Sequence, residues 1–291
     1  MTSKSKTLAR ICIFTLISFS LTFIPDIICI KIWGYEKWLS SPFSVIVTLT
    51  MFSPMIANIL TRIITKEGFD DLSLSFSLAD GKKYYAYAYF IPIIFGVIIS
   101  LIVNITHGSF TFEVLRESSF YEIFTLFMSV CVTPLFYYCF CCFGEEFGWR
   151  GYLNQRLEAL TGTAGAVIIG GIIWGLWHGV LVFNGYNFGS EHPLLGVGLM
   201  CVSCISLNAV MMYLTKKAHS VFPAVILHTV LDMGVISFTV QCMAGGLSGD
   251  IEKKITPLQS GILMLVIPEI IVGSVFFVML MHDKGKEPRN T

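Results

Sequence analysis

Residues 123–153 read IFTLFMSVCVTPLFYYCFCCFGEEFGWRGYL, an apolar run that stops at Glu145-Glu146-Phe147-Gly148-Trp149-Arg150. About 20 apolar residues are enough for a helix to cross the hydrocarbon core of a bilayer. In or beside that core an unpaired ion costs roughly 2.5–3.5 kcal/mol, so charged residues there are paired, face the protein interior and usually carry function. The stretch therefore predicts a transmembrane helix that ends at a buried polar site.

The composition of the whole chain supports the same class of protein. Of its 291 residues, 55% are hydrophobic and only 13% are charged, whereas a soluble domain has about 25% charged residues. Such a chain has too little polar surface to fold in water, which predicts an integral membrane protein with membrane lipid around it. The formal net charge is zero and no basic tail is present, which argues against a nucleic-acid partner.

Further apolar segments predict an all-α fold with about eight transmembrane helices, organised as a single membrane domain over residues 1–291. The expected helices are 11–30, 44–64, 85–105, 121–143, 164–183, 194–214, 221–241 and 258–281. Basic residues gather on the cytoplasmic side of membrane proteins. If both termini are cytoplasmic, every lysine and arginine lies on the cytoplasmic side except Lys31, Lys37, Arg116, Lys253 and Lys254. We therefore expect both termini in the cytoplasm.

The two adjacent glutamates are expected to play different parts. Neighbouring side chains on a helix point about 100° apart, so Glu145 and Glu146 cannot both face one small site. Glu146 and Arg150 are four residues apart, share a helix face and can form an ion pair. Glu145 is then the carboxylate that is free to act chemically. The alternative is that both glutamates only end the span with an interfacial ion pair.

Two later apolar segments carry the other buried polar groups. His178 follows two tryptophans in Trp174-Gly-Leu-Trp-His178, and it is either a site residue or a structural histidine that donates to a backbone carbonyl. His228 and Asp232 are four residues apart and share a helix face. This spacing suits a carboxylate that orients an imidazole, two ligands of one metal ion, or a polar clamp between helices.

Together these groups suit hydrolysis of an amide bond in or beside the membrane. A glutamate in an apolar site can act as a general base toward water. Histidines opposite it can bind the carbonyl oxygen, polarise the water or hold Zn²⁺. The spacing is not H-E-x-x-H, so a zincin-type protease is not indicated. Cys201 and Cys204 form an isolated C-x-x-C motif, without a second pair of ligands, within an apolar segment. We predict that these two thiols pack as small hydrophobic side chains.

These residues resemble the motifs of the CPBP family of intramembrane proteases, which includes the type II CAAX prenyl endopeptidases and bacteriocin-processing or immunity-associated relatives. The family's E-E-x-x-x-R stands here as Glu145 to Arg150. Its F-x-x-x-H stands as Trp174 to His178, with tryptophan in place of phenylalanine, and its H-x-x-x-N/D as His228 to Asp232. The three motifs occur in order within residues 121–241, the predicted core that carries them.

The resemblance implies an eight-helix fold with a membrane-embedded site that opens to the cytoplasm. It implies Glu145 as the base that activates water, with His178 as its partner at the scissile bond. It also implies His228 and Asp232 as stabilisers of the oxyanion, and Glu146 with Arg150 as supports of the first motif. If the reaction uses a metal, Zn²⁺ held by Glu145, His178 and His228 is the expected arrangement; a Glu/His-activated water needs none.

The predicted function is an intramembrane endopeptidase that cleaves a membrane-associated peptide or protein. A C-terminal CAAX prenylated substrate is one option, and the cell membrane is the expected location if the source is prokaryotic. Two other functions fit the same residues. One is a non-catalytic scaffold or bacteriocin self-immunity protein, and the other is a proton-coupled transporter, against which the lack of a visible internal repeat counts.

Overall fold

The computed structural model describes residues 3–76, 78–106, 119–128, 132–232 and 256–283. All regular structure in these ranges is helical, which confirms the all-α fold, and the ranges contain no strand. The principal helices are α1 (Ser3–Trp33), α2 (Tyr35–Leu39), α3 (Val45–Thr50), α4 (Ser53–Thr65), α5 (Leu78–Thr106), α7 (Phe120–Phe127), α8 (Thr133–Gly148), α9 (Asn154–Trp177), α10 (Gly179–Phe183), α11 (Pro193–Ala218), α12 (Phe222–Asp232), α15 (Pro257–Gly261) and α16 (Ile267–His282). Two π-helical turns, Trp149–Leu153 and Ile262–Val266, continue α8 and α15.

Four helical stretches within the described residues are long and apolar enough to cross a membrane. They are Ser3–Trp33, Phe136–Trp177, Pro193–Ala218 and Pro257–His282. The pair Pro42–Thr50 and Ser53–Thr65, bent by 41°, makes a fifth if it is counted as one span. The chain is thus an integral membrane protein, but the predicted number of eight spans is not confirmed.

The expected fourth and fifth spans differ most from the prediction. Residues Phe136–Trp177 form one helical path of 42 residues, which if straight would be about 63 Å long, twice the thickness of a hydrocarbon core. Gly162 interrupts the path with a φ of 73°, a left-handed conformation that glycine adopts without steric cost. The expected seventh span, 221–241, begins as α12, and its part beyond Asp232 lies outside the described residues.

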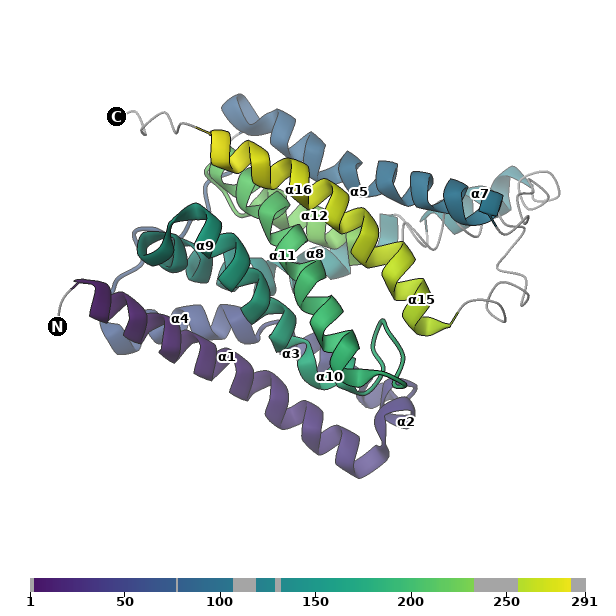
Figure 1. The fold of residues 1–291 in the computed structure, drawn as a ribbon, viewed down its shortest axis with the longest axis horizontal. Helices are drawn as coiled ribbons and strands as arrows, with labels where there is room; N and C mark the ends of the chain where they lie inside the picture. The colour runs from purple at the N-terminus through teal and green to yellow at the C-terminus, as the bar shows by residue number, and fades with distance from the viewer. Residues whose placement is uncertain (1–2, 77, 107–118, 129–131, 233–255, 284–291) are drawn as a thin grey trace.

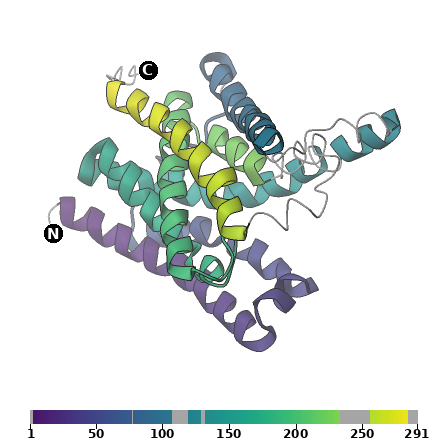
Figure 2. The same ribbon diagram turned by 45° about the vertical axis from the view of Figure 1, so that its right-hand side comes forward.

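Helix α11 lies at the centre of the bundle and packs against α9, α16, α12 and α5. Helices α1 and α4 lie on one side of it and α5 on the other (Figures 1 and 2). Glycines allow the closest approaches: a Cβ added at Gly171 or Gly175 would overlap the α11 backbone at Ile205 or Cys201. Small residues at these positions let α9 and α11 pack closely.

The end of α8, which carries the two glutamates, is held against α4. A Cβ at Gly148 would overlap the backbone of Pro54, so the two helices meet there at van der Waals distance. A π turn disturbs the regular helical hydrogen bonds and is common at functional sites. Beside the π turn that follows α8, Asn58 Nδ2 donates to the Phe147 carbonyl at 2.9 Å. These contacts fix the direction in which Glu145 and Glu146 point.

An ion-pair network ties the connection after α4 to the start of α9. Arg62 Nη1 lies 2.5 Å from Asp71 Oδ1, and Arg156 lies 2.8 Å from the other Asp71 oxygen. Glu67 accepts from Arg156 and from the hydroxyl of Tyr152. Partial burial alone would raise the pKa of Asp71, but the hydrogen bonds from the two arginines outweigh it, so this pKa lies below its ordinary value.

Candidate active site

A cavity of about 430 Å³ opens between α3, α8, α9, α11, α12 and the helical stretch Pro257–His282. Four of the six predicted catalytic residues line it, namely Glu145, His178, His228 and Asp232. Because they come from α8, the end of α9 and α12, the fold brings the three sequence motifs together. Glu146 and Arg150 do not line the cavity, and they support it from behind.

Glu145 is held in the cavity wall by two indole groups. Its side chain is buried, and Oε2 accepts from Trp174 Nε1 at 3.0 Å and from Trp149 Nε1 at 3.3 Å. Both donors bind the same oxygen, so Oε1 is the oxygen left to meet a water or substrate. Tryptophan at position 174 therefore supplies a donor that the family's phenylalanine lacks, a role that the sequence analysis did not foresee.

Glu146 joins the first motif to the third. Its Oε1 lies 2.8 Å from Arg150 Nη1 and 2.8 Å from His228 Nδ1. The pairing with Arg150 expected from the spacing is therefore present. A carboxylate can only accept hydrogen bonds, so the proton between Glu146 and His228 lies on Nδ1 and His228 donates. The Arg150 guanidinium also stacks on Trp174, with 4.0 Å between Cζ and the ring centroid.

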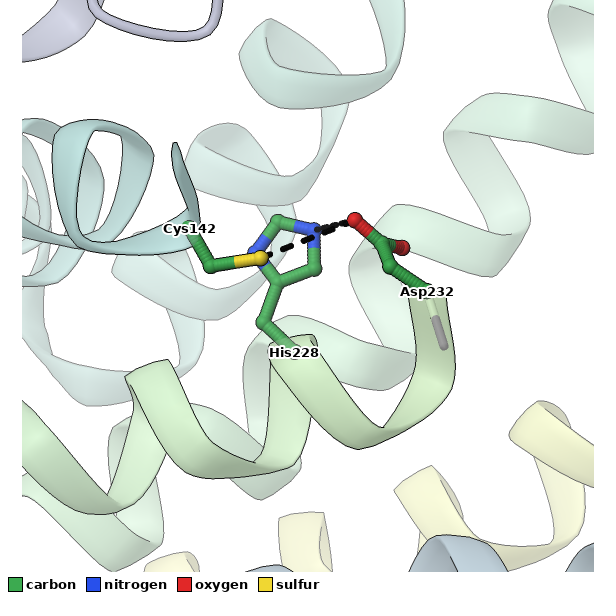
Figure 3. A group of neighbouring side chains, drawn as sticks. All are labelled: Cys142, His228 and Asp232. Carbon is green, nitrogen blue, oxygen red and sulfur yellow. Dashed lines mark hydrogen bonds and ion pairs between the residues drawn. The ribbon is translucent and has the colours of Figure 1, made fainter. Parts of the chain in front are cut away.

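Asp232 stands on the other side of the His228 ring, together with Cys142, a residue that the sequence analysis did not single out. The distance from His228 Nε2 to Asp232 Oδ2 is 3.7 Å, and Cys142 Sγ lies 3.6 Å from the same oxygen (Figure 3). His228 donates its hydrogen bond from Nδ1 to Glu146, so the carboxylate that orients the imidazole is Glu146. Cys142 could have been found from its position three residues before Glu145, on the same helix face.

His178 caps the end of α9. Its Nδ1 lies 2.9 Å from the Trp174 carbonyl oxygen, the structural role that the sequence analysis gave as an alternative. A carbonyl only accepts, so Nδ1 carries the proton and Nε2 carries the lone pair. The ring also lines the cavity, so the structural contact and a place in the site occur together.

The opposite wall of the cavity carries a carboxylate that the sequence analysis missed. Glu269 of α16 accepts a hydrogen bond from Ser203 of α11, and both residues line the cavity. It is a single acidic residue within the apolar run 261–281. Intramembrane charge of this kind is itself a signal for a site, and that signal could have been read from the sequence.

Cysteine, histidine and carboxylate groups meet at one place among the described residues. The ligand atoms of Cys142, His228 and Asp232 all lie within 4.8 Å of one another. The set predicted for a metal, Glu145, His178 and His228, is a different one, and the two sets share only His228. The predicted set stays a prediction.

Fold and site together define an all-helical integral membrane protein with carboxylate and imidazole groups around an internal cavity. Residues 120–234 match the family model described as type II CAAX prenyl endopeptidase Rce1-like. The chain is also similar to a protein from Methanococcus maripaludis named CAAX prenyl protease 2, with 30% identity over 93 residues, 31% of this chain and 34% of that protein. The match thus spans about a third of that relative. These two similarities support the CPBP family for residues 120–234.

Proposed function

We propose that this protein is an intramembrane endopeptidase in which Glu145 activates a water molecule. The observation that carries the proposal is the position of Glu145: buried, with one oxygen held by two indoles, in the wall of a cavity that His178 and His228 also line. The matched segment, residues 120–234, contains all three motifs and supports the same reaction class.

The reaction would follow the general-base course. Glu145 takes a proton from water, and the water oxygen bonds to the carbonyl carbon of the scissile amide. The C–N bond then breaks, and the amine leaves with the proton that Glu145 held. His178 Nε2, which carries a lone pair, accepts a hydrogen bond from the water and orients it.

His228 is proposed to stabilise the oxyanion of the tetrahedral intermediate. Glu146 accepts from Nδ1 at 2.8 Å, which fixes the ring so that Nε2 faces the cavity side of the site. With Asp232 3.7 Å from Nε2, the ring favours a positive charge, and a positive centre at this place stabilises a developing oxyanion. Arg150 holds Glu146, so it acts on the reaction through His228.

The substrate is proposed to be a peptide anchored in the membrane, with a prenylated CAAX peptide as one candidate. A second, apolar pocket between α5, α11, α12 and α16 adjoins the cavity and shares Leu207, Leu231 and Glu269 with it. An apolar chain beside the scissile bond would find apolar contacts there. The name of the Methanococcus maripaludis relative supports the prenylated class.

Proteolysis by the purified protein tests the proposal. A fluorogenic farnesylated CAAX peptide and its unprenylated twin are incubated with wild-type protein, Glu145→Gln and the control Glu191→Gln, which changes an exposed loop residue. We expect cleavage by wild type and control and none by Glu145→Gln. Cleavage by Glu145→Gln at the wild-type rate would refute the mechanism. Cleavage of neither peptide by wild type would refute CAAX peptides as substrates.

A further inference from the structure

Three potential metal ligands converge at the wall of the cavity, and one of them, Cys142, has no part in the proposed reaction. Cys142 is fully buried on α8, while His228 and Asp232 come from α12 and line the cavity. Their side chains point toward one another in Figure 3. A thiol, an imidazole and a carboxylate are the three ligand types that Zn²⁺ takes in proteins.

The observed separations are close to those of a tetrahedral site. With Zn–S near 2.3 Å and Zn–N or Zn–O near 2.0–2.2 Å, tetrahedral geometry places sulfur and oxygen ligands about 3.6 Å apart and nitrogen and oxygen ligands about 3.4 Å apart. Cys142 Sγ lies 3.6 Å from Asp232 Oδ2, and His228 Nε2 lies 3.7 Å from the same oxygen. All three ligand atoms lie within 4.8 Å of one another, so one ion could contact them together after small side-chain movements.

The hydrogen bond that His228 Nδ1 makes to Glu146 leaves Nε2 available to bind a metal ion. Histidines that bind metals nearly always donate their other ring N–H to a carboxylate or carbonyl, which fixes the tautomer. Glu146 accepts from Nδ1 at 2.8 Å and is itself fixed by Arg150. Nε2 then faces the Asp232 carboxylate, and two acceptors face each other favourably only with a proton or a cation between them.

We propose that Cys142, His228 and Asp232 bind one divalent cation of the Zn²⁺ type. The fourth coordination position would open into the cavity that Glu145 lines. The site rests on the proposed function and deepens it, because the cation would replace the Nε2 proton as the positive centre of the same cavity. When bound, such a cation supplies a Lewis acid for the carbonyl oxygen and lowers the pKa of a coordinated water.

A metal-binding measurement tests this without reference to proteolysis. The full chain is purified in detergent, stripped with a chelator and titrated with Co²⁺, whose thiolate charge-transfer absorption reports a Cys ligand; Zn²⁺ stoichiometry is measured in parallel. We expect one ion per chain and a charge-transfer band that Cys142→Ser removes. The neighbouring buried thiol, Cys141, is the matched control, and Cys141→Ser should keep the band.

Variants of the other groups make the test independent of whether Cys142→Ser folds. Asp232→Asn keeps the side-chain shape and should weaken Co²⁺ binding, and Glu146→Gln should weaken it about 10–100-fold, as loss of an outer partner does. Glu145→Gln should bind Co²⁺ as wild type does and yet cleave no peptide, so the two proposals fail separately. Absence of Co²⁺ binding by wild type would overturn the site. So would a band that survives Cys142→Ser or is lost only in Cys141→Ser.

Discussion

Replacing Arg150 by methionine is expected to destabilise the fold far more than removal of a surface ion pair. Glu146 is fully buried, and among the described residues Arg150 is the one cationic partner of Glu146 whose charge does not depend on protonation of a histidine. Breaking one partner of a buried pair leaves an uncompensated charge and costs about 3–5 kcal/mol. In a chain of this size that corresponds to a fall in Tm of about 6–20 °C.

The measurement is thermal unfolding of purified protein in detergent, followed by tryptophan fluorescence. Lys216→Met is the matched control, because Lys216 pairs with Glu158 on a partly exposed surface and such pairs contribute about 0–1 kcal/mol. The double variant Glu146→Gln with Arg150→Met removes both charges and should recover much of the loss. Equal Tm values for Arg150→Met and Lys216→Met, or strict additivity in the double variant, would refute the reasoning.

Three further predictions follow from contacts outside that pair. Trp174→Phe removes the 3.0 Å indole donor from Glu145, the proposed general base, and since hydrogen bonds to charged groups are worth about 1.5–3 kcal/mol we expect kcat to fall about tenfold or more at unchanged KM. Trp177→Phe, whose indole donates elsewhere, should keep kcat, and equal losses would contradict the assigned role. Gly171→Leu should prevent stable packing of α9 on α11, seen as loss of the monodisperse gel-filtration peak. A Cβ added at Gly198 meets no atom within 4 Å, so Gly198→Leu should elute as wild type. The pKa of Asp71 is depressed by its arginine partners, so its stabilising effect is complete above the ordinary value of 3.8 and is lost as pH falls below it. Unfolding between pH 3 and 6 should lose this dependence in Asp71→Asn, and an unchanged profile would exclude the network as its source.

The polar site was easier to predict from sequence than the helices around it. Charge within apolar segments is costly, so Glu145, His178 and His228 stood out by position alone, and the i, i+4 rule paired Glu146 with Arg150. Each of these signals depends on neighbours within a turn or two of one helix.

What depended on distant partners could not be predicted. Nothing local relates Glu146 to His228, which lies 82 residues further on, or shows that Trp174 donates to Glu145. The position of Cys142 three residues before Glu145 is a local signal, but its contact with Asp232 depends on α12, which packs beside α8. The number of eight spans is not confirmed, because within the described residues four helical stretches, or five with the bent pair, are long and apolar enough to cross a membrane.

The shared oxygen of Glu146 also bears on how the chain assembles during synthesis. Helix α8 leaves the ribosome long before α12, so for that interval Glu146 has only Arg150 within reach, four residues away. Docking of α12 brings the His228 ring to the same atom, and a mispaired helix would lack this second donor. Glu146 Oε1 therefore has both of its donors only in a bundle in which α12 has packed beside α8 in the native register.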